Sequence, residues 1–276
     1  MMRTPKTWFI ADFLLEDVPQ GGAELVNRQV VNMMRDSGID ISEIYSFKVT
    51  ASFLEAHKND FYILAGFINM PAKSLEFMCD NITYILYEHD HKYVINRNPA
   101  DYKDFVIPDQ QLVHQNVYSS AQAVVCQSSL HEEILRLNMP HITTHNMGGS
   151  IWTEEILTSF KDINKELIPR TTKCAIIKSS NPIKGQQIAE NYCQQNNLDY
   201  DIISAPDSLS LYRQLLSYEK LIYFPTSPET FSRIFIEAKL AGCNIICNNL
   251  IGALSESYSW NDVDQLFKEV QDKRDN

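Results

Sequence analysis

The chain lacks the features that would place it in a membrane, a secretory pathway or a repeat array. No apolar run approaches the roughly 18 residues that a membrane-spanning helix needs. The N-terminal stretch has a short apolar run and an early acid, so we expect no secretory signal peptide. Internal repeats and low-complexity segments are not evident. We therefore expect a cytoplasmic globular protein without a membrane span.

Paired cysteines and an excess of positive charge are also missing. The six cysteines, at positions 79, 126, 174, 193, 243 and 247, include no CxxC pair and lie mostly in apolar, strand-like runs. Buried, reduced thiols are the simplest interpretation. The formal net charge of −11 argues against nucleic acid or an anionic membrane as a partner. It still permits a local basic pocket.

Predicted strands and helices alternate along the whole chain, which indicates an α/β fold. The 276 residues have room for two modest domains. We predict two Rossmann-like domains facing a central cleft, residues 1–170 and residues 171–276. The boundary lies in a polar connector, and the last helix is a candidate to pack back on the N-terminal domain.

The most informative stretch runs from Leu221 to Cys247 and predicts strand, loop, helix and strand in that order. Residues 221–224 and 244–247 are short apolar runs, typical of buried parallel strands. Residues 226–228, Thr-Ser-Pro, have turn and helix-start chemistry. Apolar residues then recur at helical spacing up to Gly242, which occupies a helix C-cap position.

Two glutamates in this stretch are candidate ligand-binding residues. Glu229 lies in the loop past the carboxyl end of the first strand, where open α/β sheets bind ligands. Glu237 lies at the margin of the helix's apolar stripe, where a carboxylate needs hydrogen-bond donors. Sugar hydroxyls, a protein donor or water would each satisfy it. Spacing alone favours the alternative, a solvated glutamate at the helix margin and a first-turn glutamate that suits the helix dipole.

The stretch resembles the E-x7-E signature of retaining GT-B glycosyltransferases of the family-4 kind. The resemblance implies that Glu229 lies near the donor sugar and that Glu237 holds the ribose hydroxyls. Phe231 matches the family's phenylalanine, and Ser232 stands where the family has a glycine that lets the backbone approach the donor closely.

A second match follows the first predicted strand, where Gly21 and Gly22 open a helix. A glycine pair at such a turn can present backbone N–H groups to a ligand, although a plain tight turn is commoner. The family has the same GGAE sequence here, near the donor phosphates.

Past the strand at residues 82–87 comes the sequence Glu-His-Asp-His. His89 can donate to a sugar hydroxyl, and Asp90 could orient it. A polar loop with solvated histidines is the alternative, and a metal site is disfavoured because no third ligand is near in the sequence. In the family a His-Asp pair here places the histidine beside the donor sugar, which implies His89, with His91 as its rival.

The loop of residues 179–185 opens a helix in the second domain. Lys184 is well placed there for a diphosphate, although a lone Lys-Gly is usually a surface turn. The family has Pro-x-Lys-Gly at this place, preceded by an arginine whose position falls on Ser179. Lys178 is adjacent, and Arg233 is a candidate to replace the missing guanidinium.

The resemblance implies a metal-independent, retaining glycosyltransferase. Its donor would be a nucleotide-diphosphate sugar and its acceptor an unidentified glycan, lipid or small molecule. We expect no further cofactor and no nucleic-acid partner. A sugar-nucleotide epimerase or phosphorylase would use the same fold. A nucleotide- or glycan-binding module without catalysis is a third alternative, suggested by Ser232 and the missing arginine.

Overall fold

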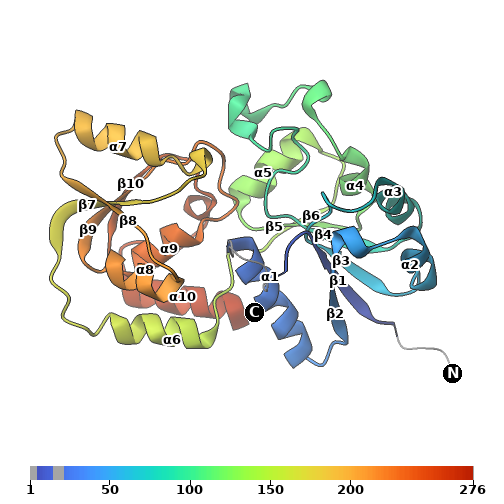
Figure 1. Ribbon diagram of the computed structural model, residues 1–276, viewed down its shortest axis with the longest axis horizontal. Coiled ribbons are helices and arrows are strands. Elements are labelled where there is room, and N and C mark those ends of the chain that lie inside the picture. The colour runs from blue at the N-terminus through green and yellow to red at the C-terminus, as the bar shows by residue number, and fades with distance from the viewer. Residues whose placement is uncertain (1–4, 15–21, 276) are drawn as a thin grey trace. The chain divides into compact units, whose positions relative to one another are not determined.

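The computed structural model describes residues 5–14 and 22–275 (Figure 1). Contacts divide this part of the chain into two compact units. Residues up to 127, together with 132–147, form the first unit, and residues 128–131 and 148 onward form the second. Residues 148–170, which the sequence analysis counts with the N-terminal domain, therefore make their contacts in the second unit.

The first unit is a parallel sheet of the order β2-β1-β3-β4-β5-β6 within the described residues. Its strands are β1 (Thr7–Ala11), β2 (Ile41–Tyr45), β3 (Phe61–Leu64), β4 (Tyr84–Tyr87), β5 (Val124–Cys126) and β6 (Thr144–Asn146). Its helices are α1 (Gly22–Asp36), α2 (Ala51–Ala56), α3 (Ala72–Asn81), α4 (Gln115–Ser120) and, from residue 132 on, α5 (Ser129–Asn138).

Helices cover both faces of this sheet. Because side chains alternate along a strand, Phe9 and Ile10 of β1 enter different hydrophobic clusters. Phe9 packs with Val26 and Val31 of α1 on one face. Ile10 packs with residues of α2, α3 and α4 on the other. Burial on both faces explains why the inner strands β1, β3, β4 and β5 are mostly apolar, whereas the edge strands β2 and β6 also contain polar residues.

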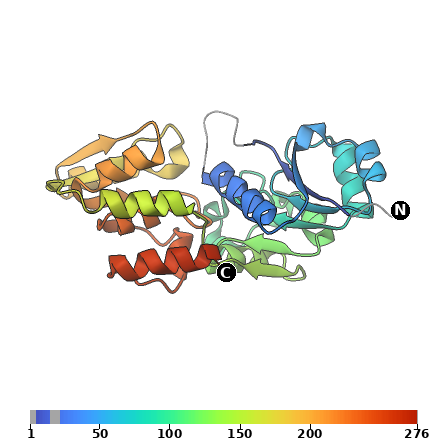
Figure 2. The same cartoon turned by 90° about the horizontal axis from the view of Figure 1, so that it is seen from below.

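The second unit is a smaller parallel sheet of the order β10-β9-β7-β8. Its strands are β7 (Thr171–Ile177), β8 (Tyr200–Ile203), β9 (Tyr218–Tyr223) and β10 (Asn244–Cys247). Its helices are α6 (Glu154–Ile163), α7 (Gln186–Gln195), α8 (Ser208–Leu215), α9 (Arg233–Leu240) and α10 (Val263–Asp275). Figures 1 and 2 show α7 apart from the other four helices. The hydrophobic clusters show the same division. Helix α7 packs on Ile222, whereas α6, α8, α9 and α10 share the cluster around Leu221.

The last helix, α10, packs on α6 and α9. In the sequence-based division α6 belongs to the N-terminal domain, but its contacts with α8 and α10 place it in the second unit. Both partners of α10 are therefore helices of the second unit.

The structure confirms the α/β class, and it differs from the sequence prediction where α9 begins. The turn chemistry at residues 226–228 predicted an early start, but α9 begins at Arg233. The reason is that Glu229 forms a parallel β-bridge with Ile251, so this segment is extended. The predicted C-cap is confirmed, since Gly242 has a φ of +74°.

The cysteines behave as the sequence predicts. All six are free: Cys126, Cys174, Cys193 and Cys243 are buried, and Cys79 and Cys247 are partly buried. Among the described residues, no helix combines the length and the apolar character needed to cross a membrane.

Candidate functional site

Each sheet has one place where its strand order reverses. In the second unit β7 lies between β8 and β9, and in the first unit β1 lies between β2 and β3. Open parallel sheets bind ligands outside the carboxyl ends of the strands at such a place. In the second unit, Lys178 follows β7 directly, and the loop to Glu229 follows β9. The reversal of strand order therefore brings the segment after β7 and the segment after β9 to the same edge of the second sheet.

Lys184 and Glu229 meet at this edge. Lys184 Nζ donates to Glu229 Oε1 at 2.7 Å, although the two residues are 45 positions apart. The Glu229 side chain is only 14% exposed, whereas that of Lys184 is 42% exposed. The Glu229 backbone is held from both sides, since its N–H donates to the Leu250 carbonyl at 2.8 Å and its carbonyl accepts from Gly252 at 2.9 Å. The carboxylate is thus fixed, and the lysine is accessible to a ligand.

The loop that carries Lys184 is attached to the β9 loop. Gly185 has a φ of +71°, and a Cβ there would lie 1.7 Å from the Phe224 carbonyl oxygen, so only glycine fits. The Thr226 N–H donates to the Ile183 carbonyl at 2.9 Å. These contacts attach the two loops to each other and so keep Lys184 next to Glu229.

Lys178 lies at the same edge, exposed, at the carboxyl end of β7. Its N–H donates to the Ile203 carbonyl at 2.8 Å, which continues the sheet pairing. Ser179, at the position of the family's arginine, donates its N–H to Gln186 Oε1 at 2.8 Å. This edge of the sheet therefore carries the side chains of Lys178 and Lys184, and position 179 supplies no guanidinium group.

Ser232 adopts a backbone conformation that favours glycine. Its φ is 82° and its ψ is 88°, and the residue is buried. Such angles are strained for any residue with a Cβ, at a cost on the order of 1–3 kcal/mol. Ser232 is therefore held in a conformation that glycine would adopt with less strain.

We expect Ser232→Gly to raise the free energy of unfolding by about 1 kcal/mol, because relief of strain outweighs the added backbone entropy of the unfolded chain. Urea denaturation measures the change. Ser227→Gly is the matched control, since Ser227 lies in the same loop without a positive φ, and it should lower stability. Destabilisation by both substitutions would contradict the strain at Ser232.

Glu237 is buried and bound by protein donors. Trp152 Nε1 donates to Glu237 Oε1 at 3.0 Å, and Arg233 lies 3.6 Å from the same oxygen. Burial raises the pKa of Glu237, and Arg233 and Trp152 oppose the rise. The Arg233 guanidinium also stacks 4.3 Å from the Trp152 ring centroid and donates to the Ile151 carbonyl at 2.6 Å. Of the alternatives for Glu237, a protein donor is observed, and the ribose role stays a prediction.

Phe231 is a core residue rather than a surface one. It is buried in the main cluster of the second unit, and its ring lies 6.1 Å from that of Tyr258. Its carbonyl accepts from the Ala253 N–H at 2.8 Å. Its contribution is to anchor the loop between Glu229 and α9.

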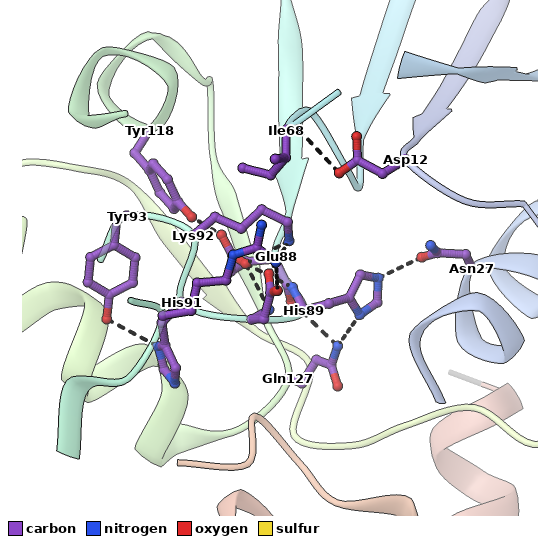
Figure 3. A network of polar contacts seen from close by, with 12 residues as sticks. Asp12, Asn27, Ile68, Glu88, His89, His91, Lys92, Tyr93, Tyr118 and Gln127 are labelled. Atoms are coloured by element: carbon purple, nitrogen blue, oxygen red, sulfur yellow. Dashed lines mark hydrogen bonds and ion pairs between the residues drawn. The ribbon is translucent and has the colours of Figure 1, made fainter. Parts of the chain in front are cut away.

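In the first unit, His89 follows β4 and has a partner at each ring nitrogen (Figure 3). Its Nε2 lies 2.6 Å from Asn27 Oδ1 of α1, and its Nδ1 lies 2.5 Å from Gln127 Nε2 past β5. An amide oxygen only accepts and an amide nitrogen only donates, so the ring is neutral with its proton on Nε2. Burial of the ring, with the Lys92 charge nearby, lowers the pKa of His89 to about 3. His89 is therefore a neutral hydrogen-bonding group at neutral pH.

Asp90 belongs to an ion-pair network, and the ring nitrogens of His89 are bound by Asn27 and Gln127. Asp90 pairs with Lys92, and its Oδ2 accepts from Arg97 NH1 at 2.9 Å. Lys92 Nζ also donates to Glu88 Oε1 at 3.1 Å, and Tyr118 donates to Glu88 Oε2. Burial raises the pKa of Asp90, but Lys92 and Arg97 outweigh it and lower the value to about 2.

Glu88 and Lys92 are both buried beneath the surface of this loop. Burial raises the pKa of Glu88, and Lys92 opposes the rise. Burial alone would lower the pKa of Lys92, but the charges of Glu88 and Asp90 raise it to about 12. The pair holds the loop that carries His89.

The remaining predicted residues of the first unit lie in different surroundings. His91 is buried, with its Nδ1 3.2 Å from the Tyr93 hydroxyl. Gly22 is the exposed first residue of α1. Gly21 lies outside the described residues. The helix that Gly22 begins also carries Asn27, so it reaches His89 through that side chain.

Sequence reasoning missed Asn27, Lys92, Gln127 and Trp152. The pairing of Lys92 was predictable from the sequence, because Lys92 lies four residues after Glu88 in a run of charged residues. No sequence pattern indicated the other three residues, because their hydrogen-bond partners are distant in the sequence. Trp152 and Glu237, for example, are 85 positions apart.

No protein-family model and no curated protein matches the sequence. Among solved structures, HepE of Anabaena in complex with UDP has a TM-score of 0.54 and 11% identity, over 97% of this chain and 89% of that chain. Its complex with UDP-glucose has a TM-score of 0.53 and 11% identity, over 98% and 90%. OtsA, a trehalose-6-phosphate synthase, has a TM-score of 0.57 and 7% identity, over 96% and 90%.

These similarities show that the chain has the GT-B fold, with two α/β units that each contain a parallel sheet. Within the described ranges, no group of three or more His, Cys, Asp or Glu side chains could hold a metal ion. Metal independence, the cytoplasmic location and the lack of a nucleic-acid partner stay predictions.

Proposed function

We propose that the protein is a retaining glycosyltransferase that takes a sugar from a nucleotide-diphosphate sugar. The observation that carries this proposal is the Lys184–Glu229 pair at the strand-order reversal of the second sheet. A cation for a diphosphate and a carboxylate for a sugar lie side by side, on a fold shared with proteins solved in complex with UDP and UDP-glucose.

Lys184 is the residue for the leaving diphosphate. When the bond from the anomeric carbon to the diphosphate oxygen breaks, the electron pair leaves with the diphosphate, and the exposed ammonium stabilises that charge. Lys178, at the end of the neighbouring strand, adds a second positive charge at this edge. These lysines take the place of a metal ion in the proposal.

Glu229 and His89 are the residues for the sugar. As the diphosphate departs, positive charge develops at the anomeric carbon, and the buried Glu229 carboxylate opposes it. The acceptor oxygen forms its bond to the anomeric carbon on the face that the diphosphate leaves, as retention requires, and its proton passes to the departing diphosphate oxygen. His89 acts as a neutral donor to a sugar hydroxyl, so its Nε2–H must exchange Asn27 for the substrate.

Thermal denaturation with UDP, GDP, ADP, CDP or dTDP in the presence of EDTA tests the proposal. A ligand at about 100 times its dissociation constant adds about 2.7 kcal/mol, which raises the melting temperature by several degrees. We expect a rise with one nucleotide, and UDP is the first choice because the neighbours bind it. A rise that needs magnesium would contradict metal independence, and no rise with any nucleotide would contradict the donor class.

Two variants should separate binding from turnover. Glu237→Gln is expected to weaken UDP affinity about tenfold, since one charge-assisted bond to the ribose contributes about 1.5 kcal/mol. His89→Ala is expected to keep UDP affinity and to lower the transfer rate by at least tenfold. Calorimetry and a transfer assay measure the two quantities. Unchanged UDP affinity in Glu237→Gln would remove its ribose role, and full turnover in His89→Ala would remove the role of His89.

A nucleotide- or glycan-binding module without catalysis is the second candidate. It is favoured by one observation, the Cβ of Ser232 where the family has none. Such a module would bind a nucleotide in the denaturation assay and would transfer sugar to no acceptor.

A further inference from the structure

Three neighbouring loops of the first unit expose large apolar side chains at one edge of the sheet. Phe13 follows β1 and is 57% exposed, Phe47 follows β2 and is 53% exposed, and Ile68 follows β3 and is 38% exposed. The strands are parallel neighbours in the order β2-β1-β3, so their carboxyl ends meet. This edge also contains the strand-order reversal of the first sheet.

Asp12 ties the three loops together. Its Oδ1 accepts from Ser46 Oγ at 2.5 Å and from the Asn69 N–H at 2.9 Å, and its Oδ2 accepts from the Ile68 N–H at 3.2 Å. Figure 3 shows Ile68 beside Asp12. A Cβ at Gly66 would lie 2.5 Å from the Asp12 backbone nitrogen, so the β3 loop lies directly against Asp12. The Asp12 carboxylate therefore binds groups of the neighbouring loops, and it fixes the loops from which the apolar side chains extend.

The exposed side chains are flanked by buried ones, so their exposure is built into the loops. Phe47 and Lys48 are exposed between the fully buried Ser46 and Val49. Ile68 and Asn69 are exposed between the buried Phe67 and Met70. A frayed loop would expose all of its residues, whereas each of these two loops exposes one apolar and one polar residue between buried ones.

A cation orients one of the rings. The Tyr45 and Phe47 ring centroids are 5.3 Å apart, and Lys48 Nζ lies 5.0 Å from the first and 5.8 Å from the second. Such cation–π contacts hold the rings in place at an exposed site. Loops that expose fixed apolar groups together mark a binding surface more often than an ordinary solvated one.

We propose that Phe13, Phe47 and Ile68 form a subsite for an alkyl or aryl group of the acceptor. The inference rests on the proposed function, and it narrows the acceptor to an amphiphile with an apolar group. The position supports it, because β3 pairs with β4, and the loop after β4 carries His89. An apolar group held by the β3 loop would therefore place the rest of the acceptor near His89.

Binding of three glucosides, measured by ligand-observed NMR below the micelle concentration, tests the subsite. Octyl and p-nitrophenyl glucoside carry an alkyl and an aryl group, and methyl glucoside carries neither. We expect binding of at least one of the first two and at least fivefold weaker binding of methyl glucoside. The stronger of the two identifies the group as alkyl or aryl. Equal binding of all three would overturn the proposal.

Phe47→Ala and Ile68→Ala should each weaken the preferred glucoside at least fivefold and leave UDP affinity unchanged. Leu137→Ala is the matched control, since Leu137 is 51% exposed near the end of α5 and away from these loops, and it should have no effect. Equal losses in the control would overturn the subsite. So would sedimentation showing that the wild type self-associates through this patch and that Phe47→Ala does not.

The same measurements separate this inference from the proposed function. If the wild type binds the apolar glucoside through Phe47 but binds no nucleotide, the subsite stands and the glycosyltransferase proposal fails. If the wild type binds UDP and shows no preference for an apolar group, the subsite fails alone.

Discussion

Lys92→Met should lower the free energy of unfolding by about 3–5 kcal/mol, the cost of leaving a buried charge without its partner. Lys92 and Glu88 are both buried, 3.1 Å apart, and Glu88 cannot reach water when the ammonium is removed. Urea denaturation of the variant and of the wild type measures the difference at neutral pH.

Lys58→Met is the matched control, because Lys58 pairs with Glu55 at 3.2 Å on the surface. Exposed pairs contribute below about 1 kcal/mol, so the control should lose little stability. Glu88→Gln in the Lys92→Met background should recover part of the loss by removing the unpaired charge. A double variant less stable than Lys92→Met would show that packing rather than charge dominates.

The stability of Lys92→Met should also depend on pH in a defined direction. Burial already raises the pKa of Glu88, and loss of the lysine raises it further. A carboxyl group whose pKa is higher in the folded than in the unfolded state stabilises the protein at pH values below its unfolded-state pKa. This contribution is lost as the pH rises through the folded-state pKa. The penalty should therefore be smaller at pH 5 than at pH 8. An equal penalty at both values would contradict an unpaired carboxylate.

Lys184→Ala should weaken the affinity for UDP by about tenfold to a hundredfold, since a hydrogen bond to a charged group contributes about 1.5–3 kcal/mol. The lysine is accessible at the edge of the second sheet, where it pairs with Glu229. Isothermal titration calorimetry measures the affinity. Lys173→Ala is the control, because Lys173 lies on β7, the strand before the loop of Lys184, and pairs with Asp201 on the surface.

Glu229→Gln separates the two members of the pair. It frees Lys184 from its carboxylate, so UDP affinity should stay the same or increase, while the transfer rate falls by at least tenfold. Lost UDP affinity in Glu229→Gln would show that the carboxylate, and not the lysine, organises the diphosphate site. Full affinity in Lys184→Ala would remove the lysine from that site.

The sequence by itself determined the architecture. Short apolar runs alternate with helical periodicity, and only parallel sheets with helices on both faces bury such runs on both sides, as Phe9 and Ile10 do. Gly242 was predicted from local backbone chemistry alone, because a helix end needs a residue that tolerates positive φ. The start of α9 was predicted too early, because the β-bridge of Glu229 with Ile251 overrides local turn propensity.

Only the tertiary structure decided the partners of the candidate site residues. The sequence singled out Glu229 and Lys184 separately, and the strand-order reversal brought them to 2.7 Å. It left open what satisfies Glu237, and the fold supplied Trp152. It proposed Asp90 for orienting His89, whereas the observed ring partners come from α1 and the end of β5. Local patterns specify elements because they depend on neighbouring residues, but hydrogen bonds between distant segments depend on how the strands are ordered in the sheet.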